Sequence, residues 1–193
     1  GVILHFSILK GGDNMKKIMF WITLIVGITV VFGSCSSSED TTTTSSTAIP
    51  DYETTTLSGK VSGTSWTFQT GRVTVPSSSS GSYWVYMTND NLSNACSSTY
   101  TGTSSNPTVF YARSEAPAVG ETELGWGTDK GTATAYDGST NYILSTGKIS
   151  IVTATTTEVT GKMYAKYDSD NEINGTFTLS RCCLSDGTYS LCE

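Results

Sequence analysis

The sequence predicts an all-β protein: a single antiparallel β-sandwich, or alternatively a small, partly open β-barrel, after an N-terminal signal peptide and a flexible linker. Apolar and polar residues alternate with a period of two along much of the chain after residue 50, as expected for strands with one buried face. No stretch of this region has the i, i+3, i+4 apolar spacing of an amphipathic helix. The alternating segments are rich in Thr, Val, Ile, Tyr and Trp, which favour strands.

The N-terminal region predicts an export signal. Residues 1–14 precede the first Met, at position 15, and we interpret them as a mistranslated upstream extension, since Lys10-Gly11-Gly12 can be encoded by a string that resembles a bacterial ribosome-binding site. Residues 15–34 are predicted to be a signal peptide, in which Lys16 and Lys17 precede a mostly apolar run of 15 residues, Ile18 to Phe32. A transmembrane helix needs about 20 apolar residues, so this shorter run is typical of a cleaved signal.

The tetrad Phe32-Gly33-Ser34-Cys35 resembles the lipobox of bacterial lipoproteins, with two small residues before the cysteine and Phe32 where Leu is commoner. This resemblance implies that a diacylglyceryl group is attached to the Cys35 thiol and that the chain is cut just before Cys35. The expected product is an outer-membrane lipoprotein, at the periplasmic face or the cell surface. The mature chain then has 159 residues with 8 basic and 16 acidic side chains, and it contains no histidine.

Residues 35–50 are predicted to form the lipidated cysteine and a flexible tether. Ser and Thr account for 61 of the 193 residues, and the tether is especially rich in them. Such a segment has too little apolar surface to offset the entropy lost on ordering. The folded domain is therefore expected to begin near residue 51 and to extend to residue 193.

Eight strands are predicted in residues 51–193, which have the size of one domain. Turn-forming residues separate many of them, at Ser62-Gly63, Pro76–Gly81, Asp137-Gly138 and Ser169–Glu172. Consecutive hairpins of this kind favour a sandwich or a small barrel. The predicted strands are Leu57–Val61, Ser65–Val75, Ser82–Thr88, Thr108–Arg113, Thr132–Tyr136, Tyr142–Ala154, Glu158–Asp168 and Asn174–Cys183.

The alternation also predicts which side chains face the core. Phe177 and Leu179 are expected to point inward, and Thr176 and Thr178 outward. Residues 83–87 are apolar at every position, which predicts a central strand covered on both faces. The opening SGKVSGTSWTF and the closing NEINGTFTLSRC resemble the ends of small, uncharacterised lipoprotein domains of diderm bacteria, a resemblance that implies no known activity.

Four cysteines remain beyond Cys35, and an even number in an exported chain indicates disulfides. Neighbouring Cys182 and Cys183 point to opposite faces of a strand. If Asp186-Gly187 turns the chain back, a loop of two or four residues places Cys192 on the face of Cys183, and the four-residue loop sets them directly opposite. We therefore expect Cys183–Cys192 and Cys96–Cys182, with free thiols and a Cys₄ zinc site as the alternatives.

Composition excludes several classes of function. A mature chain without histidine has no Ser-His-Asp or Cys-His catalysis and no His-ligated zinc. Its acidic balance and scattered basic residues argue against a nucleic-acid partner. Residues 168–172 have oxygen ligands at alternating positions, as calcium loops do, but a hairpin turn is the better interpretation. We expect no catalytic residues, no cofactor and no metal.

The expected function is that of a non-catalytic binding or structural module, with a glycan or a protein at the cell surface as its partner. The first alternative is a carbohydrate-binding or adhesive module, with Trp126, Trp84 and Tyr86 as the candidate ligand-binding residues. Trp126 is the strongest of these because Gly125-Trp126-Gly127 predicts a loop with few packing neighbours. The second alternative is a glycoside hydrolase that uses two carboxylates, although no spacing indicates a particular pair.

Overall fold

A computed structural model of the protein describes residues 48–76, 81–113, 115–127 and 129–193. The predicted upstream extension, the signal peptide, Cys35 and most of the tether lie outside the described residues. Among the residues that it does describe, no helix is long and apolar enough to cross a membrane.

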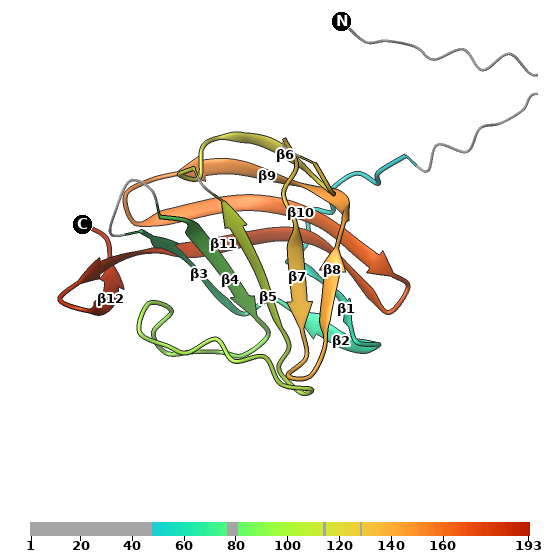
Figure 1. The fold of residues 1–193 in the computed structure, drawn as a ribbon, viewed down its shortest axis with the longest axis horizontal. Helices are drawn as coiled ribbons and strands as arrows, with labels where there is room; N and C mark the ends of the chain where they lie inside the picture. The colour runs from blue at the N-terminus through green and yellow to red at the C-terminus, as the bar shows by residue number, and fades with distance from the viewer. Residues whose placement is uncertain (1–47, 77–80, 114, 128) are drawn as a thin grey trace, which may run out of the picture. The chain divides into compact units, whose positions relative to one another are not determined.

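In the described part of the chain, twelve strands belong to one continuous sheet. Nine of them follow one another in the order β6-β9-β10-β11-β3-β4-β5-β7-β8 and curl into a nearly closed, barrel-like sheet (Figure 1). This confirms the predicted all-β class, within the predicted range from sandwich to partly open barrel. The strands are β1 (Ser58–Val61), β2 (Thr64–Thr67), β3 (Thr70–Val75), β4 (Tyr83–Thr88), β5 (Thr108–Arg113), β6 (Gly120–Leu124), β7 (Ala133–Tyr136), β8 (Asn141–Leu144), β9 (Thr146–Ala154), β10 (Glu158–Asp168), β11 (Asn171–Ser185) and β12 (Thr188–Leu191).

Strand β11 is the longest strand and pairs with four others. It pairs with β10 on one side, and on the other side with β1 near its start and with β3 farther along. Its last residues pair with β12. The β3–β11 pair is parallel, a departure from the predicted all-antiparallel sheet. The reason is that β1 runs antiparallel to β11, β2 reverses the direction of β1, and β3 continues in the direction of β2.

The predicted strand boundaries agree with the structure where alternation is uninterrupted. Strands β5 and β10 have the predicted limits. The predicted strand Ser65–Val75 is divided into β2 and β3 because Phe68 donates its amide hydrogen bond to Leu57, next to β1, whereas Gln69 donates to Thr88 in β4. The predicted strand Tyr142–Ala154 is divided at Ser145 into β8 and β9. Strands β6 and β12 were not predicted, because both are short and mainly polar or exposed.

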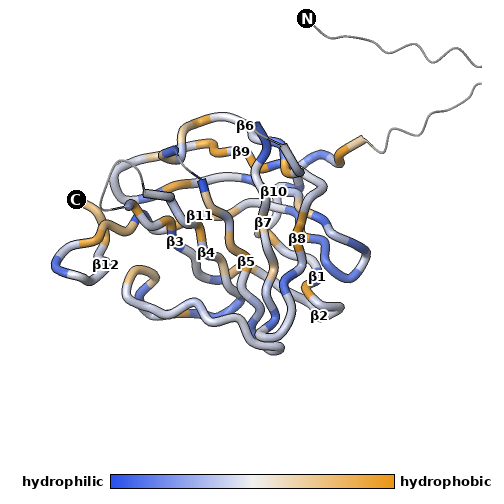
Figure 2. The backbone as a smooth tube through the Cα atoms, in the orientation of Figure 1, coloured by the Kyte–Doolittle hydropathy of each residue, from blue (hydrophilic) through white to orange (hydrophobic). Residues whose placement is uncertain are grey.

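The core lies inside the curled sheet. Phe177 and Leu179 are buried there as predicted, and the hydrophilic residues gather at hairpin tips such as that between β10 and β11 (Figure 2). Trp66 is also buried, and its indole Nε1–H donates a 2.9 Å hydrogen bond to the Pro107 carbonyl. The prediction that residues 83–87 are covered on both faces is wrong. Val85 points inward and is buried, but Trp84 points outward and is 39% exposed, because the second face of β4 has no sheet packed on it.

Two hairpin turns explain how the chain reverses so tightly. Ser62-Gly63 (φ 52° and 72°) joins β1 to β2, and Asp186-Gly187 (φ 51° and 77°) joins β11 to β12. Positive φ at both central residues defines the type I′ turn, whose twist matches that of the flanking strands. Residues 168–172 lie at the β10–β11 hairpin turn, where the Asp168 carboxylate accepts hydrogen bonds from the Asp170 amide and the Asn171 side chain, both at 2.9 Å.

The structure contains the two expected disulfides, Cys96–Cys182 and Cys183–Cys192. The loop at Asp186-Gly187 has two residues, so Cys183 lies directly opposite Ser190 rather than Cys192. The Cys192 amide bonds to the Arg181 carbonyl, and Cys192 is therefore the diagonal neighbour of Cys183 on the same face. The alternation of side chains along the strand thus predicted the correct cysteine pairs. The four-residue loop, which would set Cys183 directly opposite Cys192, does not occur.

The two disulfides should differ in their contribution to stability. Cys96–Cys182 spans 86 residues and Cys183–Cys192 spans 9. From the chain entropy of the unfolded state, replacing the long-range pair by serine should lower the free energy of unfolding by about 4–5 kcal/mol, and replacing the short-range pair by about 2–3 kcal/mol. Urea denaturation of Cys96→Ser/Cys182→Ser and of Cys183→Ser/Cys192→Ser measures both values. An equal loss in the two double variants would contradict this ordering.

Candidate functional site

Trp84 and Tyr86, two of the three candidate ligand-binding residues, lie side by side on the outer face of β4. Their ring centres are 6.2 Å apart and their ring planes differ by 21°. Phe110 of β5 continues this arrangement 6.5 Å from Trp84, and Tyr100 of the β4–β5 loop continues it 5.5 Å from Tyr86. We call Phe110, Trp84, Tyr86 and Tyr100 the outer aromatic row. It forms because alternate residues of β4 point outward and the neighbouring strand supplies an aromatic residue at the matching position.

Arg72 of β3 lies at the Tyr100 end of the outer aromatic row. The centre of its guanidinium is 4.8 Å from the ring centre of Tyr100 and 5.4 Å from those of Tyr86 and Tyr189. A guanidinium within about 6 Å of an aromatic ring is attracted by the ring quadrupole. Arg72 therefore holds together three rings that come from β4, the β4–β5 loop and β12.

The Arg72 guanidinium also fixes the loop that carries Tyr100. Its Nη1 donates hydrogen bonds to three backbone carbonyls of that loop, those of Ala95, Cys96 and Ser98. The Cys96–Cys182 disulfide connects the same loop to β11, the strand next to β3. Two independent links thus hold the loop against the outer face of the sheet.

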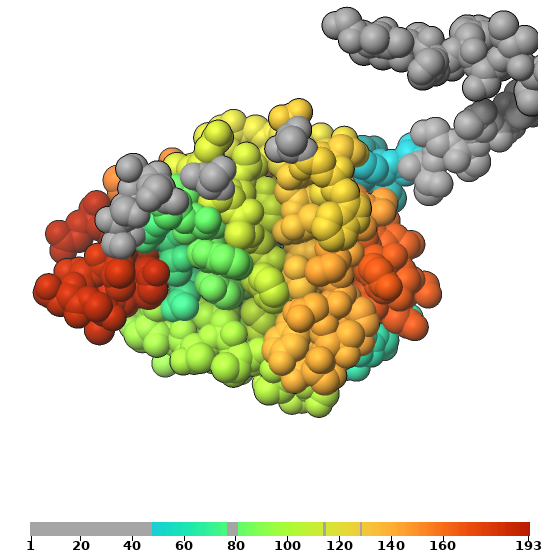
Figure 3. All heavy atoms as spheres, in the orientation of Figure 1, coloured from blue at the N-terminus to red at the C-terminus, as the bar shows by residue number. Residues whose placement is uncertain are grey.

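A groove of about 450 Å³ lies between this loop, the outer face of β4 and the β11–β12 hairpin. These three segments adjoin on the face shown in the space-filling view (Figure 3). We call it the Arg72 groove. The lining is rich in aromatic and hydroxyl-bearing residues and consists of Arg72, Tyr86, Cys96, Ser97, Ser98, Thr99, Tyr100, Gly187, Thr188 and Tyr189.

Two tyrosines of the groove, Tyr86 and Tyr100, keep their protons at neutral pH. Burial raises the pKa of Tyr100 to about 12, although the positive charge of Arg72 opposes this shift. Burial also raises the pKa of Tyr86, with Arg72 again opposing it. The groove therefore presents neutral phenol groups, which both donate and accept hydrogen bonds.

Trp126, the strongest candidate from the sequence, lies in the loop after β6, apart from the outer aromatic row and from the groove lining. Its side chain is 74% exposed, as expected for the Gly125-Trp126-Gly127 loop. The structure therefore brings Trp84 and Tyr86 together and leaves Trp126 outside the site. Tyr164, which is buried, and Tyr167, which is exposed, also lie outside the groove lining.

Sequence reasoning missed Arg72, Tyr100 and Tyr189 as members of the site. Their positions in the sequence have no common motif, and they meet only because β3 pairs in parallel with β11. One signal was present: a Cys96–Cys182 disulfide requires residues near Cys96, such as Tyr100, to lie close to β11.

The groove lining contains no Asp or Glu, so a pair of catalytic carboxylates would have to lie elsewhere. The two-carboxylate hydrolase stays a prediction without an assigned pair. Across the described ranges, no three His, Cys, Asp or Glu side chains gather in a way that could hold a metal ion. The chemistry that the groove offers is stacking and hydrogen bonding.

Comparison with protein-family models, with curated proteins and with solved structures finds no match to this chain.

The raised pKa of Tyr100 predicts a loss of stability in alkaline solution. An unfolded tyrosine ionises near pH 10, whereas folded Tyr100 keeps its proton up to a pKa of about 12. The folded state therefore binds more protons than the unfolded state between these values, and the free energy of unfolding falls as the pH rises through this window. Denaturation at several pH values should show a smaller fall for Tyr100→Phe than for the wild type. The matched control is Tyr167→Phe, which removes a phenol group outside the groove. If Tyr100→Phe kept the pH dependence of the wild type, the alkaline loss of stability could not be assigned to Tyr100.

Proposed function

We propose that the protein is an outer-membrane lipoprotein, anchored through Cys35, whose β domain binds glycans without catalysis at the outer aromatic row and the Arg72 groove. The observation that carries this proposal is the row of four aromatic rings that leads along the surface of β4 and β5 into a polar groove.

The aromatic row supports a sugar as the ligand. The C–H groups of a pyranose ring pack against aromatic faces, and its hydroxyl groups need nearby donors and acceptors. The ring planes of Trp84 and Tyr86 are nearly parallel, and the groove adjoining Tyr86 is lined by residues with hydroxyl groups. Trp84 is 39% exposed and the other three rings of the row are half-buried, and a contiguous apolar patch at the surface indicates an interaction site.

The charge of the site argues against nucleic acid, which also stacks on aromatic rings. The mature chain is acidic, and Arg72 is the only basic residue in the groove lining. Its guanidinium is already engaged with loop carbonyls and tyrosine rings. One cation is too few for a phosphate backbone, which binds through several clustered positive charges, whereas a neutral glycan needs none.

The anchor would hold this site near the membrane. The tether between Cys35 and residue 50 has about 15 residues of mainly short polar side chains, which as a flexible chain span about 20 Å. A tether of this length keeps the domain close to glycans at the membrane surface and so raises their effective concentration. Binding there does not need high affinity.

Glycan-array binding by the full chain tests the proposal. Replacing Trp84 by alanine removes a stacking face and should weaken binding of the retained oligosaccharides by about tenfold. Tyr100→Ala should weaken it comparably, because it removes both a ring and a contact of Arg72. Trp126→Ala is the matched control, since it removes another exposed tryptophan outside the site. If the wild type bound no glycan on the array, the proposed glycan-binding function would be contradicted. If only Trp126→Ala lost binding, the assignment of the binding site to the outer aromatic row and the Arg72 groove would be contradicted.

Lipidation is tested by metabolic labelling. Cells that express the full chain should incorporate labelled palmitate into it, and Cys35→Ala should abolish the label because the thiol is the acceptor. Cys183→Ser/Cys192→Ser, which retains Cys35, is the control and should remain labelled. An unlabelled wild-type chain would contradict lipidation at Cys35. It would not bear on glycan binding, which the array tests separately.

A further inference from the structure

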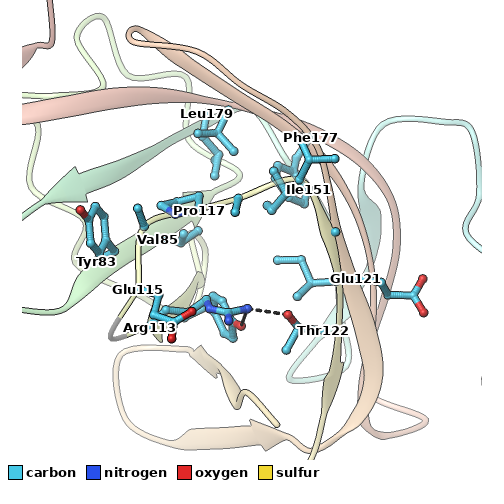
Figure 4. A pocket seen from close by; sticks show the side chains of 17 residues that line it. Tyr83, Val85, Arg113, Glu115, Pro117, Glu121, Thr122, Ile151, Phe177 and Leu179 are labelled. Carbon is cyan, nitrogen blue, oxygen red and sulfur yellow. Dashed lines mark hydrogen bonds between the residues drawn. The ribbon is translucent and has the colours of Figure 1, made fainter. Parts of the chain in front are cut away.

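A second, separate cavity lies inside the curled sheet, between β4 and β5 on one side and β9, β10 and β11 on the other. Its volume is about 200 Å³, and residues 115–119, which precede β6, also line it. Figure 4 shows apolar side chains of several strands facing this space. The apolar lining from the strands consists of Val85, Ile149, Ile151, Val159, Phe177 and Leu179.

Arg113, at the end of β5, is the only basic residue that lines this cavity. Its side chain extends into the space seen in Figure 4, where Nη1 donates hydrogen bonds to the hydroxyl oxygens of Thr122 and Tyr111. Both of these partners are neutral. The ion pairs found among the described residues join other side chains and do not include Arg113. A guanidinium with five N–H groups is thus placed at an apolar cavity without a carboxylate to balance it.

The two acidic residues of the lining do not fill this role. The Glu121 carboxylate points away from the cavity in Figure 4 and accepts a 3.0 Å hydrogen bond from the Tyr52 hydroxyl. Glu115 is exposed at the opening and forms no ion pair with Arg113. Arg113 forms no ion pair among the described residues, so its guanidinium is available to an external anion, with Glu115 as a nearby charge that opposes such binding.

We propose that this cavity binds a small apolar carboxylate, whose hydrocarbon part enters the cavity and whose carboxylate pairs with Arg113. The geometry of guanidinium and carboxylate allows two parallel hydrogen bonds. An apolar cavity of about 150 Å³ accommodates benzene, so a cavity of about 200 Å³ suits a ring or chain only slightly larger. An arylalkanoate of the size of phenylpropionate fits both the volume and the charge.

This site is independent of the glycan proposal. Alternate residues of β4 face the two sites, with Tyr83 and Val85 lining the cavity and Trp84 and Tyr86 in the outer aromatic row. The Arg72 groove and the cavity share no lining residue. Either site can therefore fail its test without affecting the other.

Calorimetric titration of the full chain with three probes of equal size tests the proposal. The probes are phenylpropionate, phenylpropanol and phenylpropylamine, which present a negative, a neutral and a positive group on the same hydrocarbon. Hydrogen bonds to a charged partner should favour the carboxylate over the alcohol by about tenfold to a hundredfold, and the amine should bind most weakly. Failure of phenylpropionate to bind at millimolar concentration, or equal binding of acid and alcohol, would overturn the proposal.

Variants then locate the site. Arg113→Gln should remove the preference for the acid while leaving alcohol binding nearly unchanged, and Glu115→Gln should strengthen acid binding because it removes the opposing charge. Val85→Phe, which fills the cavity, should abolish binding of acid and alcohol alike, and Ile151→Phe at its half-buried edge serves the same purpose if Val85→Phe does not fold. A preference for the acid that survives in Arg113→Gln, or full binding in a folded cavity-filling variant, would overturn the proposal.

Discussion

The pairing of β11 is the constraint on which the rest of the structure depends. This strand joins β10 to β3 within the curled sheet, receives β1 on the same edge as β3, and turns back into β12. Its neighbouring residues Cys182 and Cys183 lie on opposite faces and form different disulfides. A shift of one residue in its register would exchange its buried and exposed side chains and break both connections.

The candidate glycan site follows from this pairing. Because Ser180 and Cys182 lie opposite Arg72 and Thr74 in the parallel pair, the loop bonded to Cys182 is held over Arg72. The same strand leads into β12, which brings Tyr189 to within 5.4 Å of the Arg72 guanidinium. The groove is thus formed by segments distant in sequence. Strand β4 then separates two environments, since its outward residues form the aromatic row and its inward residues border the apolar cavity.

Much of the fold could be predicted from the sequence because strands with one buried face leave a period-two pattern. The limits of β5 and β10, the inward positions of Phe177 and Leu179, and the cysteine pairs all follow from that alternation. The polar strand β6 gives no such pattern, and the break between β2 and β3 depends on hydrogen bonds to different neighbours. Of the candidate site residues, Trp84 and Tyr86 were found, but the sequence favoured Trp126 because an aromatic residue between two glycines indicates exposure. It could not indicate Arg72, Tyr100 or Tyr189, since their proximity depends on a parallel pair that no local pattern encodes.

Native-state hydrogen exchange of the intact chain tests the central role of β11 most directly. If the sheet is organised around this strand, its amides bonded to β10 and β3 should exchange only through global unfolding, and they should be the slowest in the protein. The edge strands β6 and β8 should exchange faster, through local opening. Exchange in β11 as fast as in those edge strands would show that the sheet opens along β11, and it would contradict this account.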